Sequence, residues 1–74
     1  MNSSRVFETL GVAPTEDYKA LRKAYINRLK RLNKKLAKVR GTEDQEKVSE
    51  ALLELNEAFN TIEDNKDDLT LLVM

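Results

Sequence analysis

Two long stretches of the chain carry apolar residues at the spacing of an α-helix, and they predict the main elements of the fold. In the first stretch the apolar positions recur every three or four residues with no Pro or Gly between them, at Tyr18, Leu21, Tyr25, Leu29, Leu32, Leu36 and Val39. The second stretch repeats this spacing at Val48, Ala51, Leu52, Leu55, Ala58, Phe59 and Ile62. Such a stripe is one face of an amphipathic helix. We therefore expect helices over about residues 16–40 and 43–63.

A shorter apolar segment precedes these two stretches and predicts a first helix over about residues 4–10. Gly11 follows it, at the position where the end of a helix favours a residue with positive φ. The residue before Pro14 is disfavoured in helical conformation, so a turn is expected there. Thr15 or Asp17 then has the side chain needed to cap the first long helix.

The two long helices are separated by little more than Gly41 and Thr42, so we expect them to pack antiparallel. The segment from Thr42 to Gln45 has the pattern of a capping box, which would begin the second long helix. At the C-terminus, residues 67–73 are expected to form a short turn on the core. The alternative is that residues 69–74 form an apolar end that mediates dimerisation. The predicted fold is all-α, with a short N-terminal helix and a long antiparallel hairpin.

Charge is divided between the two halves of the chain. Residues 19–40 contain ten of the thirteen Lys and Arg residues and no acid, whereas residues 43–68 contain ten of the thirteen Asp and Glu residues. The formal net charge is zero, so long-range attraction to nucleic acid is weaker than the basic stretch alone suggests. One interpretation of the basic stretch is a solvated face whose cations pair with the acids of the second long helix, at about 0–1 kcal/mol per exposed pair.

The composition excludes several kinds of chemistry. The chain has no Cys and no His, which removes disulfides, thiolate zinc sites and imidazole bases. Asp64, Asn65 and Asp67 lack the glycine and the terminal glutamate of a calcium loop, so we interpret them as a polar turn. We expect no enzymatic activity, no metal and no cofactor. No segment approaches the length of a membrane span and the N-terminus has no apolar signal core, so the expected location is cytoplasmic.

Three segments of the chain together resemble the J-domain of DnaJ-type co-chaperones. They are Phe7–Val12, Leu21–Tyr25 and Leu55–Asp64, with the sequences FETLGV, LRKAY and LNEAFNTIED. The family shows a Tyr-x-x-Leu-Gly-Val opening, an Ile-Lys-Lys-Ala-Tyr segment in its second helix and an Ala-Tyr-x-x-Leu-x-Asp close in its third. The three segments follow one another in the family's order and cover nearly the whole chain. The resemblance implies a J-like fold and a DnaK-type partner that contacts the basic second helix.

This chain lacks the His-Pro-Asp tripeptide of the J-domain family. This tripeptide should fall at Asn33-Lys34-Lys35, but the chain has no His and its one Pro is Pro14. In the family, the loop that contains the tripeptide couples binding to ATP hydrolysis by the DnaK-type chaperone. We therefore expect a degenerate J-like domain whose second helix continues through residues 33–35. A second departure is Arg28, which occupies the position of a core Leu, with Leu29 taking over its role. The implied function is a non-catalytic adaptor or regulator of a chaperone or another protein complex, without stimulation of the ATPase.

The candidate binding residues lie on the basic face of the second predicted helix. They are Arg22, Lys23, Lys30, Arg31, Lys34 and Lys35. Arg22 and Lys23 match positions of the family's partner contact, and the other four are included because of their location. The expected partner is a DnaK-type chaperone, a J-protein or another acidic protein surface. The alternative function is a small regulatory protein that binds nucleic acid through the same helix. It is less favoured because no aromatic residue lies among the cations: Tyr18 and Tyr25 both fall on the apolar stripe.

Overall fold

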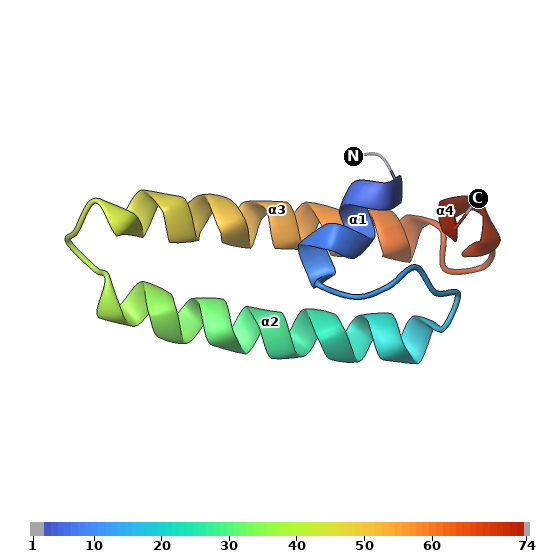
Figure 1. Cartoon of the computed structure of the whole chain (residues 1–74), viewed down its shortest axis with the longest axis horizontal. Helices are drawn as coiled ribbons and strands as arrows, with labels where there is room; N and C mark the ends of the chain where they lie inside the picture. The colour runs from blue at the N-terminus through green and yellow to red at the C-terminus, as the bar shows by residue number, and fades with distance from the viewer. Residues whose placement is uncertain (1–2, 74) are drawn as a thin grey trace.

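The computed structural model describes residues 3–73, and every regular element in this range is a helix. Helix α1 spans Ser3–Leu10, α2 spans Tyr18–Lys38, α3 spans Asp44–Asp64 and α4 spans Thr70–Val73. In Figure 1, α2 and α3 run side by side in opposite directions, and α4 lies at the end of the hairpin where α2 begins. The all-α class predicted from the sequence is confirmed for the described residues.

Helix α2 begins two residues later than expected because Asp17 is its N-cap. The Asp17 carboxylate accepts hydrogen bonds from the backbone N–H groups of Lys19 and Ala20, at 3.1 and 3.3 Å. Thr15, the other candidate, supports this cap instead of making it, since its hydroxyl oxygen accepts a hydrogen bond from the Asp17 N–H at 3.1 Å. The side-chain oxygen of Asp17 thus satisfies donors that have no partner within the helix.

The turn between α2 and α3 does not contain the predicted capping box. The Thr42 hydroxyl donates to the carbonyl oxygen of Val39, so it completes the end of α2 and is not available to α3. The Gln45 side chain accepts a hydrogen bond from the N–H of Gly41 at 2.8 Å, one residue before the position that a capping box requires. Gly41 itself has φ of +79°, in the left-handed region that favours glycine. The N-cap of α3 is Glu43, whose backbone is already helical and whose side chain makes no capping hydrogen bond.

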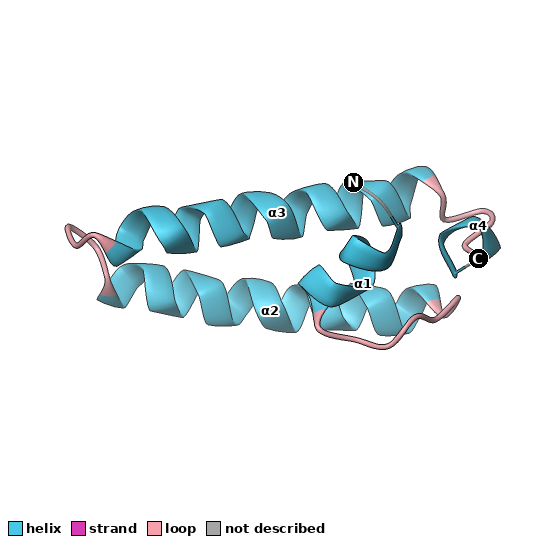
Figure 2. Cartoon of the chain, turned by 45° about the horizontal axis from the view of Figure 1, so that its top comes forward, coloured by secondary structure: helices cyan, strands magenta, loops and turns pink. Residues whose placement is uncertain are grey.

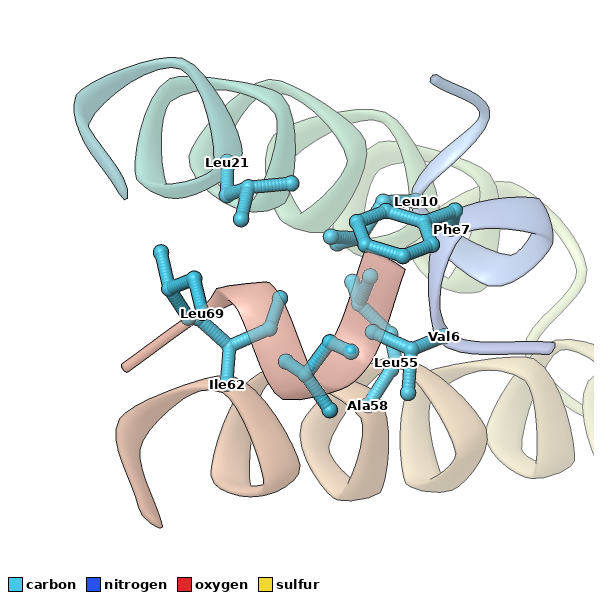
Figure 3. Close-up of a cluster of buried hydrophobic side chains, with 9 residues drawn as sticks. Val6, Phe7, Leu10, Leu21, Leu55, Ala58, Ile62 and Leu69 are labelled. Carbon is cyan, nitrogen blue, oxygen red and sulfur yellow. The ribbon is translucent and has the colours of Figure 1, made fainter. Parts of the chain in front are cut away.

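The hydrophobic core lies at the end of the hairpin that α1 and α4 cover. Its buried side chains come from all four helices and from the residue before α4: Val6, Phe7, Leu10, Leu21, Leu55, Ala58, Ile62, Leu69 and Leu72. All of these except Leu72 are labelled in Figure 3, where they converge between the helices. Figure 2 shows α1 lying over the seam between α2 and α3 only near this end. Because α1 has only eight residues, the rest of the hairpin is a two-helix structure. Consequently Leu21 is the one fully buried residue of the α2 stripe, and Leu29, Leu32, Leu36 and Val39 are half-buried.

The residues before and within α4 pack on this core. Leu69 and Leu72 are buried, and the Thr70 hydroxyl donates to the carboxylate of Glu16 at 2.5 Å. Leu71 and Val73 point outward, with 61% and 39% of their surface exposed. The interpretation of residues 69–74 as a wholly unpacked end is therefore wrong for Leu69 and Leu72, and Met74 lies outside the described residues.

Candidate functional site

The six candidate residues all lie on α2 and are all exposed. At about 100° of rotation per residue, Lys23, Lys30 and Lys34 share a strip on the side of α2 that faces away from the core. Arg22 and Lys35 lie on opposite flanks of that strip, about 140° apart around the helix axis by the same rotation. The structure therefore brings together three of the predicted residues and separates two of the others.

The outer side of α2 has two shallow hollows with apolar residues between the cations. One is lined by Lys19, Arg22, Lys23, Ile26 and Asn27. The other is lined by Lys30, Arg31, Asn33, Lys34 and Ala37. Each hollow combines long cationic side chains with an aliphatic residue, Ile26 or Ala37. An acidic protein surface with small apolar side chains is complementary to this arrangement.

The basic residues of α2 make no ion pair within residues 3–73. The ion pair found in this range joins α1 to α3, between Arg5 and Glu54 at 3.0 Å, and both side chains are about half exposed. The interpretation in which the cations of α2 pair with the acids of α3 is therefore wrong for this part of the chain. The cause is the rotation of the helices about their axes. Since each helix turns its apolar stripe toward the other, most of its charged side chains point outward.

The two tyrosines of α2 belong to the seam between the long helices. The ring of Tyr25 stacks on Phe59, with ring centroids 4.2 Å apart and planes inclined by 8°, and its hydroxyl donates to Asn56 at 2.9 Å. The Tyr18 hydroxyl donates to the carboxylate of Glu63. This hydrogen bond raises the pKa of Tyr18 above 10.0, with smaller upward contributions from burial and from the charge of Glu63, and Arg22 opposes the shift.

Both tyrosines fall on the apolar stripe of α2, as the sequence predicts, but their polar partners were not predicted. Tyr18 and Tyr25 are seven residues apart, and so are Asn56 and Glu63, which they contact in reverse order. Equal spacing on two antiparallel helices is the signal that could have identified this pairing.

Residues 33–35, where the resemblance to the J-domain would place the His-Pro-Asp tripeptide, lie inside α2. The helix is unbroken from Tyr18 to Lys38, so no loop is present at that position. Asn33, Lys34 and Lys35 are exposed on consecutive positions of one helical turn. Arg28 is also exposed and Leu29 is half-buried, so the apolar side chain at this level of α2 comes from position 29.

A hollow of about 330 Å³, which the sequence pattern did not predict, lies where α1 meets the hairpin. It is lined by Arg5, Glu8, Thr9, Arg28, Leu32, Ala51, Glu54 and Leu55. Its lining combines the aliphatic side chains of Leu32, Ala51 and Leu55 with charged side chains of both signs. Residues of α1, α2 and α3 all contribute to this hollow.

No family model, no curated protein and no solved structure matches this chain. Within residues 3–73, no helix is both long and apolar enough to cross a bilayer. The described residues likewise include no group of three or more acidic side chains placed to hold a metal ion.

Proposed function

We propose that this protein is a J-like interaction module that binds an acidic protein surface through the cations of α2. In this role it is an adaptor or regulator of a chaperone or of another protein complex. The observation that supports the proposal best is that the six candidate residues are exposed and make no ion pair within the described chain. Their charges have no internal partner to give up when an external one binds.

The module is proposed to bind without stimulating a DnaK-type ATPase. In the J-domain family, stimulation depends on a His-Pro-Asp loop after the second helix. Here the corresponding residues, Asn33, Lys34 and Lys35, continue α2, and the sequence contains no His. The partner in this proposal is a DnaK-type chaperone, a J-protein or another protein with an acidic surface.

The arrangement of the aromatic residues favours a protein partner over nucleic acid. Binding to single strands commonly uses aromatic rings that stack on bases beside the cations. Tyr25 instead stacks on Phe59 within the hairpin, and Tyr18 hydrogen-bonds to Glu63. The cations of α2 alone could still bind phosphates, and salt separates the two cases. Phosphate binding falls steeply between low and moderate salt, whereas an interface that also contains apolar contacts weakens gradually.

The binding proposal is tested with the double variant Arg22→Ala/Lys23→Ala. Both side chains are exposed, so the variant should keep the helical circular dichroism of the wild type and bind a DnaK-type chaperone or a J-protein more weakly. The matched control is Lys47→Ala/Lys66→Ala, which removes two exposed cations that lie outside α2 and should bind like the wild type. Equal affinity of the wild type and the Arg22/Lys23 variant for every such partner would overturn the proposed site.

The absence of stimulation is tested by steady-state ATP hydrolysis. We expect the protein to leave the rate of a DnaK-type chaperone unchanged, alone or with substrate peptide, under conditions in which a true J-protein accelerates it. A second titration adds the protein to the chaperone and the true J-protein together, where competition for the same surface lowers the stimulated rate. A marked acceleration by this protein alone would show that residues 33–35 are not inert.

A further inference from the structure

The outer side of α3 is an acidic strip with an exposed leucine at its centre. Leu53 exposes 64% of its surface, the largest exposed fraction among the large apolar residues described. Glu46, Glu50 and Glu57 lie on the same side of α3, at intervals of four and seven residues, and all three are exposed. None of these carboxylates forms an ion pair within residues 3–73. We call these four residues the α3 strip.

The outer side of α2 presents the complementary pattern at the same spacing. Lys19, Lys23 and Lys30 are exposed cations at intervals of four and seven residues, and Ile26 is a half-buried apolar residue between the last two. We call these four residues the α2 strip. Starting at Lys19 and at Glu46, both strips read charge, charge, apolar, charge at offsets of zero, four, seven and eleven. This is the spacing of residues that share one side of a helix and face a packed neighbour.

We propose that the α2 strip of one molecule docks on the α3 strip of a second copy of this chain. With the two helices parallel and in register, Lys19 faces Glu46, Lys23 faces Glu50 and Lys30 faces Glu57. Ile26 then meets Leu53 between the second and third charged pairs. Both helices have 21 residues, and in this register their ends are offset by a single residue.

The contact joins two different surfaces, so it does not close on itself. The two strips lie on opposite edges of the hairpin, since each helix turns its apolar stripe inward. A docked pair therefore keeps one free α2 strip and one free α3 strip, and further copies can add in an open series. The inference uses the same side of α2 as the proposed function but does not depend on it, because the α3 strip has no part in that function.

The test measures mass against protein concentration by analytical ultracentrifugation at low and high salt. At about 0.01 M salt, where the Debye length is about 30 Å, the mass of the wild type should rise above that of a dimer. At about 1 M salt, where the Debye length is about 3 Å, it should fall to that of the monomer. Reversing the charge of the α3 strip with Glu50→Lys/Glu57→Lys should abolish self-association. Reversing the charge of the α2 strip with Lys23→Glu/Lys30→Glu should do the same. Mixing the two variants should restore it, because each then offers the charge that the other lacks.

Two controls keep the result specific. Asp67→Lys/Asp68→Lys changes the net charge as much as Glu50→Lys/Glu57→Lys but lies outside both strips, so it should associate like the wild type. Leu53→Ala should weaken association while leaving the thermal unfolding of the monomer unchanged. A wild type that stays monomeric at low salt would overturn the inference, and so would growth that persists in the strip variants through the exposed Leu71 and Val73. The Glu50→Lys/Glu57→Lys variant keeps the cations of α2, so its binding to the external partner tests the proposed function separately.

Discussion

At the scale of single residues, the hydrogen bond from Tyr18 to Glu63 couples the hairpin to pH. It raises the pKa of Tyr18 above that of a free phenol, because the neutral phenol is the form that donates to the carboxylate. With the folded pKa above the unfolded value near 10.0, this contribution to stability is complete below the unfolded pKa. It is lost as the pH rises through the folded pKa. The stabilising contribution of this hydrogen bond is therefore lost only in alkaline solution.

The first prediction follows from this pair. In a Tyr25→Phe background, Tyr18 is the one remaining tyrosine, and ultraviolet absorbance of the tyrosinate then reports its pKa. We expect Glu63→Gln to lower that pKa, because the charge is removed and the acceptor weakened. Glu57→Gln, on the outer side of α3, should not change it. An unaltered titration in Glu63→Gln would show that Glu63 is not the partner of Tyr18.

The second prediction concerns the depth of burial of four leucines. Leu55 is fully buried, so Leu55→Ala should lower the free energy of unfolding by about 2–5 kcal/mol. Leu32 and Leu52 are only half-buried, and replacing either by Ala should cost clearly less than this. Leu53→Ala should stay within about 0.5 kcal/mol of the wild type. Urea unfolding at low protein concentration measures the series, and equal losses at positions 53 and 55 would contradict the structure of α3.

At the scale of elements, the sequence predicted the existence and type of the long helices better than their ends. Each apolar stripe fixes one side of a helix over many turns, so α2 and α3 were expected close to where they lie. The first residue of α2 depended on whether Thr15 or Asp17 made the cap, and both have suitable side chains. The capping box failed because Thr42 bonds to the end of α2 instead of the start of α3. Which side chain caps a helix end depends on the geometry of the turn, and the spacing of apolar residues does not predict that geometry.

Burial and pairing were less predictable than the elements. Periodicity shows which side of α2 is apolar but not how far α1 reaches along it, and the eight residues of α1 leave Leu32 and Leu36 half-exposed. The charge division suggested ion pairs between α2 and α3, yet the rotation of each helix directs those charges outward. For the candidate site, the helix and its exposure could be predicted. The separation of Arg22 and Lys35 onto opposite flanks required the structure.

The third prediction addresses the continuity of α2. Writing the family's tripeptide into this chain, as Asn33→His/Lys34→Pro/Lys35→Asp, places Pro in the interior of a 21-residue helix. Because Pro lacks the N–H and its ring clashes with the preceding turn, the variant should lose about 3 kcal/mol of stability. It should not gain stimulation of a DnaK-type ATPase, since the tripeptide would lie in a helix and not in a loop. Asn33→His/Lys35→Asp, which keeps Lys34, should remain close to wild-type stability by thermal unfolding.

At the scale of the whole molecule, charge segregation opposes stability within each long helix. Lys19 and Lys23 are four residues apart on α2, as are Lys30 and Lys34, and such like-charged neighbours, with Cβ atoms about 5–6 Å apart, destabilise a helix. The acids of α3 lie toward the opposite edge of a molecule whose shorter dimensions are 20 and 18 Å. Attraction between the two edges therefore acts over a longer distance than repulsion within either one. Salt at about 0.1 M, with a Debye length of about 10 Å, screens both.

The fourth prediction is that added NaCl does not lower the melting temperature of the monomer. If the hairpin depended on ion pairs between α2 and α3, salt would weaken them and the melting temperature would fall. Since the cations of α2 have no such pairs within the described residues, screening mainly relieves repulsion between near neighbours, and we expect a small rise or no change. The melting temperature should be measured at low protein concentration, because self-association at low salt would stabilise the folded chain by mass action. A steady fall in melting temperature between about 0.01 and 0.15 M salt would mean that attraction between the two charged edges holds the hairpin together, and that its apolar seam contributes less than its burial indicates.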